Sequence, residues 1–191
     1  MKHRVLSLVA VLAALTGCSD STSPVVGFNG AGSFTYTGAG GGTHSASGDF
    51  TAVTAANLYA EDWAYGVRSD AEVVTGVFSN QPRTTTTHDM MVIGINRVTA
   101  GSSSISAECE PEVDEACTGF VFYRGQSNAF GTFEHVCILT SGSVNITSIS
   151  NSRMVGTFSG SGFCFDNEQN EDSFTVTNGS FDVALISEDL T

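Results

Sequence analysis

The chain has very few basic side chains. Its 191 residues include seven Lys and Arg against 20 Asp and Glu, and Lys2 is the only lysine. Nucleic-acid binding requires clustered Lys and Arg to neutralise phosphates, so we expect no nucleic-acid partner. Beyond residue 2 the chain also lacks the amine that a lysine Schiff base needs. The acidic balance indicates a surface that attracts cations or simply maintains solubility.

Long hydrophobic runs are missing as well. The apolar run at residues 5–15 is interrupted by Ser7 and follows the basic residues Lys2, His3 and Arg4. Crossing a bilayer as a helix takes roughly 20 apolar residues, so this run is too short. A basic head, a short apolar run and then small residues form the pattern of a secretory signal peptide. We therefore predict that residues 1–17 are a signal peptide.

The end of this leader reads Leu15-Thr16-Gly17-Cys18 and resembles the lipobox of bacterial lipoproteins. The resemblance implies that the Cys18 thiol receives a diacylglycerol, that the leader is cut before Cys18, and that the new amine is acylated. Several acyl chains would hold the protein on a membrane. Ser19 after the cysteine implies the outer membrane of a bacterial cell envelope. The small polar residues that follow predict a flexible tether over residues 18–30.

The five cysteines are an odd number, which normally indicates a free thiol. Lipidation of Cys18 would leave four, and an oxidising envelope favours two disulfides. Three pairings are possible; we favour Cys109–Cys117, which closes an acidic segment, and Cys137–Cys164, which joins two strands. A zinc site is the alternative, but there is no Cys-x-x-Cys pair and no nearby histidine pair.

The rest of the chain predicts one all-β domain over residues 31–191. Short β-type runs alternate with turns rich in Gly, Ser, Asn and Thr. Roughly nine to eleven strands at this spacing favour an antiparallel β-sandwich, with a small β-barrel as the alternative. The run at residues 88–98 is apolar on both faces and predicts a central strand. Residues 55–64 contain helix formers and are compatible with one short helix.

Two turns are predicted near the C-terminus. Asn151-Ser152 is a plausible two-residue turn between runs at 143–149 and 153–165. Asn178-Gly179 is a strong hairpin signal between runs at 174–176 and 181–185. Segments 142–147, 155–160 and 176–183 resemble the C-terminal half of small uncharacterised β-sandwich lipoproteins of the bacterial envelope. That resemblance implies a fold and no particular activity.

Aromatic residues gather in one stretch that is a candidate ligand-binding site. If this stretch is extended, Tyr59, Glu61, Trp63 and Tyr65 share one face. Aromatic rings beside a carboxylate could stack on a sugar and bond its hydroxyls. The alternative is an aromatic stripe that packs in the core, because large aromatic side chains are highly buried on average.

A second candidate is a calcium site in a polar loop. Asp166, Glu168, Asn170 and Asp172 offer the hard oxygen ligands that Ca²⁺ prefers. The spacing fails as an EF-hand, because the positions that need Gly and the bidentate Glu carry Glu171 and Thr177. A solvated loop is the alternative, and no other metal or cofactor is expected.

Catalytic motifs are not evident. The chain has no Gly-x-Ser-x-Gly sequence, and His44, His88 and His135 are scattered. We therefore predict no catalytic residues and a monomeric, lipid-anchored envelope protein with a binding or structural role. Its partner would be a glycan or an envelope protein. The alternative is a hydrolase acting on envelope glycans, which would need two carboxylates across a cleft.

Overall fold

The computed structural model describes residues 29–49, 62–68, 73–79, 87–95, 99–109, 117–127 and 133–187. The described part is all-β and contains no helix. The strands are β1 (Asn29–Thr37), β2 (Gly42–Asp49), β3 (Trp63–Arg68), β4 (Val73–Ser79), β5 (Thr87–Ile95), β6 (Gly101–Ile105), β7 (Cys117–Ser127), β8 (His135–Ile149), β9 (Arg153–Asp166) and β10 (Glu171–Ser187). The predicted signal peptide, Cys18 and residues 19–28 of the predicted tether lie outside these ranges. None of the described residues forms a helix long and apolar enough to cross a membrane.

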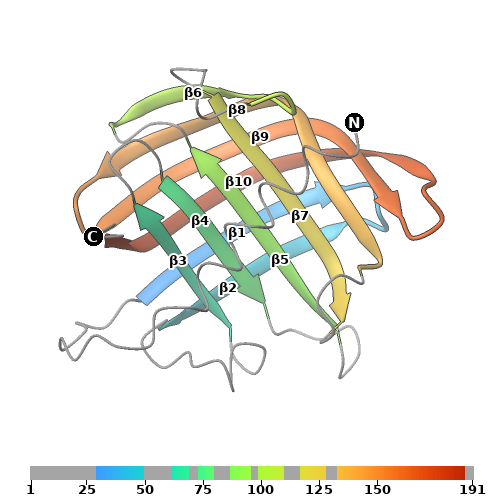
Figure 1. The fold of residues 1–191 in the computed structure, drawn as a ribbon, viewed down its shortest axis with the longest axis horizontal. Coiled ribbons are helices and arrows are strands. Elements are labelled where there is room, and N and C mark those ends of the chain that lie inside the picture. Colours follow the sequence, from blue (N-terminus) through green and yellow to red (C-terminus); the bar gives the residue numbers. More distant parts are fainter. Residues whose placement is uncertain are drawn as a thin grey trace.

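The strands form two layers that cross at a steep angle (Figure 1). The hydrogen-bonded order is β2-β1-β10-β3-β4-β5-β7-β6-β8-β9, with additional pairings of β10 with β9 and of β7 with β8. One layer contains β2, β1, β10, β9 and β8, and the other contains β3, β4, β5 and β7. Most neighbours are antiparallel, while β10–β3 and β6–β7 are parallel. The predicted all-β sandwich is confirmed.

Long strands connect the two layers at their corners. The first residues of β8 pair with β7 on one side, while β8 pairs with β9 over its whole length on the other. Likewise, β10 pairs with β1 and β9 over most of its length, and its last residues pair with β3. Strands that switch between layers in this way are typical of sandwiches whose sheets cross at large angles. The run predicted at 143–149 is therefore the second part of a longer bent strand that begins at His135.

Aromatic side chains fill the space between the layers. Phe34 on β1 is 1% exposed, and its ring lies 5.0 Å from that of Phe122 on β7 and 5.8 Å from that of Phe158 on β9. Met91 and Ile93 on β5 join the same core cluster. Met90, on the opposite face of β5, is also buried at 4% exposure. The prediction that this strand is central is thus confirmed.

The hairpin predicted at Asn178-Gly179 is wrong. β10 runs without reversal from Glu171 to Ser187, and its pairing with β9 shifts register between Val176 and Gly179. Asn178 has φ of 53°, in the left-handed region that a two-residue turn would also use. Because β1 and β9 hold β10 on both sides of this point, the irregularity is accommodated as a β-bulge.

The other predicted turn is confirmed. The segment between β8 and β9 reverses the chain, and the Ser150 amide donates to the Arg153 carbonyl at 2.8 Å. Residues 55–61 lie outside the described ranges, so most of the possible helix at 55–64 does too. Its last two residues, Trp63 and Ala64, begin β3 and are extended. β6 was not predicted, because its Ser-rich sequence lacks apolar alternation.

Both favoured disulfides are present. Cys137 and Cys164 are directly opposite each other on β8 and β9, with Cα atoms 3.9 Å apart and both residues fully buried. Cys109 follows β6 and Cys117 is the first residue of β7, and the bond between them closes a short loop. Of the three possible pairings, the favoured one is therefore confirmed.

Candidate functional site

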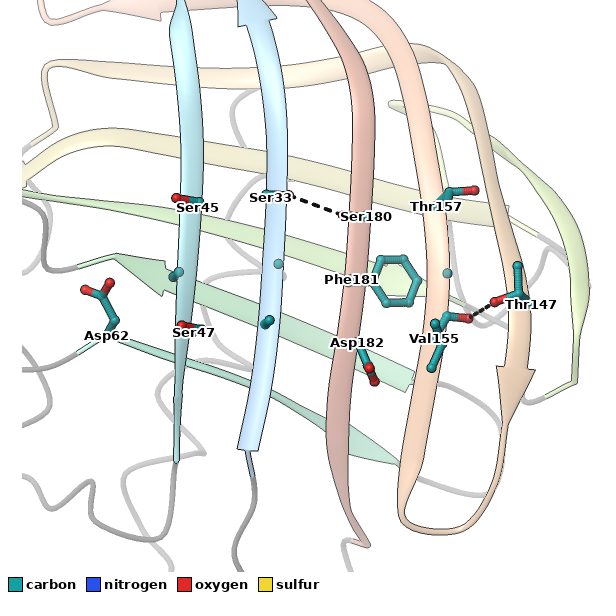
Figure 2. A pocket seen from close by; sticks show the side chains of 14 residues that line it. Ser33, Ser45, Ser47, Asp62, Thr147, Val155, Thr157, Ser180, Phe181 and Asp182 are labelled. Atoms are coloured by element: carbon teal, nitrogen blue, oxygen red, sulfur yellow. Dashed lines mark hydrogen bonds between the residues drawn. The ribbon is translucent and has the colours of Figure 1, made fainter.

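A shallow open groove of about 470 Å³ crosses the outer surface of the β2-β1-β10-β9 layer. Its walls are two rows of outward side chains that run across the strands, as Figure 2 shows. The register pairs Ser45, Ser33, Ser180 and Thr157 in the first row. Side chains two residues away along each strand form the second row, namely Ser47, Ala31, Asp182 and Val155. We call this feature the hydroxyl groove.

The floor of the hydroxyl groove is formed by the residues between the two rows. Ala46, Gly32, Phe181 and Gly156 are paired across the same four strands and are buried. Successive residues of a strand point to opposite faces, so these positions show mainly backbone to the groove. A Cβ at Gly156 would lie 2.4 Å from the Phe181 ring, which fills the space on the inner side. The floor is therefore backed by the aromatic core.

Two further residues mark the ends of the hydroxyl groove. Asp62, just before β3, lies beyond the edge strand β2, and Thr147 lies on β8 at the opposite end (Figure 2). The distance from β2 to β8 covers four strand spacings, or about 20 Å. A ligand that follows the groove would therefore lie across the strands in an extended shape.

The hydroxyls of the walls are exposed, and only some are used internally. Ser33 Oγ and Ser180 Oγ form a hydrogen bond of 3.2 Å across β1 and β10. Thr147 Oγ1 donates to the Val155 carbonyl at 3.1 Å. A hydroxyl has one donor and two acceptor positions, so each of these groups retains capacity for a ligand. Such a surface can exchange hydrogen bonds with another hydroxyl-bearing molecule.

One ion pair involves the wall of the groove. Arg153 Nε lies 2.7 Å from Asp182 Oδ1, and both side chains are about half exposed. The hydrogen bond that Arg153 donates to the Asp182 carboxylate raises the pKa of the guanidinium above its usual value. Exposed pairs of this kind contribute at most about 1 kcal/mol to stability. The pair therefore mainly holds the Asp182 carboxylate in place at the groove wall.

The structure does not present Tyr65 as a sugar-stacking surface. Tyr65 on β3 is only 3% exposed, while the side chain of Trp63 lies outside the described part. Burial raises the pKa of its phenol well above the usual value. Tyr59 and Glu61 lie outside the described residues. Tyr65 therefore matches the packing alternative, while the binding role of the other three stays a prediction.

Three of the four calcium candidates hydrogen-bond to one another, and the fourth, Asp172, bonds elsewhere. The Asp166 carboxylate accepts hydrogen bonds from the amides of Glu168 and Asn170 at 2.9 and 2.8 Å, and from Asn170 Nδ2 at 2.8 Å. These bonds, the one from the Asn170 side chain foremost, lower the pKa of Asp166. Asp172 instead accepts from the Ala39 amide at 2.9 Å. Within the described ranges, no three His, Cys, Asp or Glu side chains converge on a common point.

The histidines also differ in their surroundings. His44 is 3% exposed and lies 5.3 Å, centre to centre, from the rings of Phe34 and Phe122. His135 begins β8, and the side chain of His88 lies outside the described part. His44 thus belongs to the aromatic core.

Comparison of the chain with protein-family models, with characterised proteins and with solved structures finds no match. The hydroxyl groove was not predicted either. Its sequence signal is the recurrence of Ser or Thr at alternate positions, as at Ser33, Thr35 and Thr37 in β1 and at Thr157, Ser159 and Ser161 in β9. That pattern indicates an exposed strand face. The alignment of such faces into one groove depends on strand register.

Proposed function

We propose that this protein is a non-catalytic glycan-binding lipoprotein of the bacterial envelope. It would be anchored through Cys18 to the outer membrane and would bind its ligand in the hydroxyl groove. The observation that carries this proposal is the open, hydroxyl-walled groove across four paired strands. The two disulfides support an oxidising, extracytoplasmic location.

The chemistry of the hydroxyl groove matches that of a polysaccharide. Serine and threonine hydroxyls can donate to and accept from sugar hydroxyls, and the backbone floor leaves room for a chain to lie between the walls. Each such hydrogen bond contributes only about 0.5–1.5 kcal/mol net. A single site would therefore bind weakly, and many copies anchored on one membrane would gain strength through avidity.

The test compares two double variants of the full chain purified in detergent. Thr157→Gln with Ser180→Gln places longer side chains in the hydroxyl groove. Ser159→Gln with Thr175→Gln makes the same kind of change on the same two strands, β9 and β10, outside the groove. We expect binding on a glycan array to be lost in the first variant and retained in the second.

Two results would contradict the proposal. One is the absence of glycan binding by the unaltered chain in any condition, which would favour a structural role or a protein partner. The other is equal binding by both double variants, which would place the ligand elsewhere. Circular dichroism of each variant would show that the β-fold is retained.

A further inference from the structure

The first wall row of the hydroxyl groove continues past Thr157 onto two more strands. Thr157 on β9 is paired with Asn145 on β8, and Asn145 is paired in turn with Ser102 on β6. Residues directly opposite each other on antiparallel strands lie on the same face, and both Asn145 and Ser102 are exposed. The row therefore crosses six strands, from Ser45 on β2 to Ser102, or about 24 Å at the usual strand spacing.

The floor beside this row continues in the same direction. Gly156 is paired with Ile146 on β8, and Ile146 is paired with Gly101 on β6. The Ile146 side chain belongs to the core cluster and Gly101 has no side chain, so the outer surface here is again mainly backbone. None of these floor residues carries a charge, and neither do Asn145 and Ser102. The continuation thus offers a ligand a neutral, hydrogen-bonding surface like that of the groove.

Asn145 brings an amide into a row that otherwise consists of hydroxyl side chains. Ser102 Oγ donates a hydrogen bond of 3.1 Å to Asn145 Oδ1. The amide oxygen and nitrogen branch to opposite sides of the same carbon, so this bond turns the two N–H donors of Asn145 away from β6. A hydroxyl hydrogen rotates freely, whereas the amide hydrogens are fixed in the amide plane. Asn145 is therefore suited to orient a sugar oxygen that lies over β8.

From the continued row and the oriented amide we infer that the binding site extends over β8 and β6 and takes a linear, neutral glycan long enough to reach Asn145. This inference rests on the proposed glycan-binding function and names the class of glycan. A chain that follows the row passes Ser33 and Thr157 before it reaches Asn145, so added sugars gain contacts until the row ends at Ser102. Short oligomers bind within the groove alone.

The experiment measures the affinity of the full chain in detergent for two neutral, linear series of sugar oligomers. One series consists of glucose and the other of N-acetylglucosamine, each from the disaccharide to the hexasaccharide. One hydrogen bond corresponds to about a twofold to tenfold change in affinity. Because the longer chains gain several, we expect the hexasaccharide of at least one series to bind at least about tenfold more tightly than its disaccharide.

Two matched double variants assign this gain to the continued row. Asn145→Ala with Ser102→Ala truncates the row, whereas Ser143→Ala with Ser104→Ala changes a neighbouring exposed pair on the same two strands, outside the groove. The first variant should bind the hexasaccharide about twofold to tenfold more weakly and the disaccharide normally, which also shows that its fold is intact. The second should match the unaltered chain for both. Equal losses in the two variants, or no loss in the first, would overturn the inference.

The failure of this inference differs from the failure of the proposed function. Equal affinity for all lengths of a series that binds would overturn the extension over β8 and β6 and leave glycan binding intact. Binding of another glycan on the array, but of neither series, would overturn the assignment to linear, neutral glycans alone. The absence of binding to any glycan would overturn both.

Discussion

Removing the Cys137–Cys164 disulfide should destabilise the protein more than removing Cys109–Cys117. The two bridges join residues separated by 27 and 8 positions. In the chain-entropy model, these loops correspond to about 3.6 and 2.5 kcal/mol of stabilisation at 25 °C. Cys137 and Cys164 are also fully buried in the core, with no solvent-accessible surface. Replacing both with alanine adds the cost of a cavity to the entropic loss.

The assay is urea and thermal unfolding of two double variants, Cys137→Ala with Cys164→Ala and Cys109→Ala with Cys117→Ala. For a domain of this size, about 2–4 °C of melting temperature corresponds to 1 kcal/mol. We therefore expect losses of about 7–14 °C and 5–10 °C from the loop terms alone. The comparison is internal, because each variant lacks one bridge and keeps the other. An equal or larger loss from the Cys109 and Cys117 variant would refute the reasoning from loop length and burial.

Three further predictions concern the backbone, the pH dependence and the anchor. Gly30→Ala should lower the free energy of unfolding by about 1–3 kcal/mol, because the new Cβ would lie 1.9 Å from the Ala64 carbonyl oxygen. A Cβ at Gly94 would meet nothing within 4 Å, so Gly94→Ala should be close to neutral in the same denaturation assay. The pKa of Asp166 is lower in the folded state than in the unfolded state. The carboxylate therefore stabilises the folded protein above the unfolded pKa of about 3.9, and this stabilisation is lost as pH falls through the folded pKa. Acid unfolding of Asp166→Asn should thus be less steep with pH than that of the unaltered protein, and identical curves would contradict this. Cys18→Ala should move the protein from the membrane fraction to the soluble fraction, and unchanged retention on fractionation would refute lipidation at Cys18.

The sequence by itself determined the fold class and the disulfides. The pattern of apolar residues along a strand is a local property, so the continuous run around Met91 and the alternating run around Phe158 could be recognised without their neighbours. The pairing Cys137–Cys164 also followed from local information, because both cysteines fall in strands close together in the chain. The prediction of lipidation at Cys18 rests on four consecutive residues, Leu15-Thr16-Gly17-Cys18.

Only the tertiary structure decided where the strands bend, whether Asn178-Gly179 forms a turn or a bulge, and which side chains share one surface. Asn178 has the positive φ that a hairpin turn also uses, yet β1 and β9 hold both flanks of β10, so the site is a bulge. Ser33 and Thr157 are 124 positions apart and share a groove wall because β1, β10 and β9 pair in one register. Register depends on contacts between distant segments, which no single strand encodes.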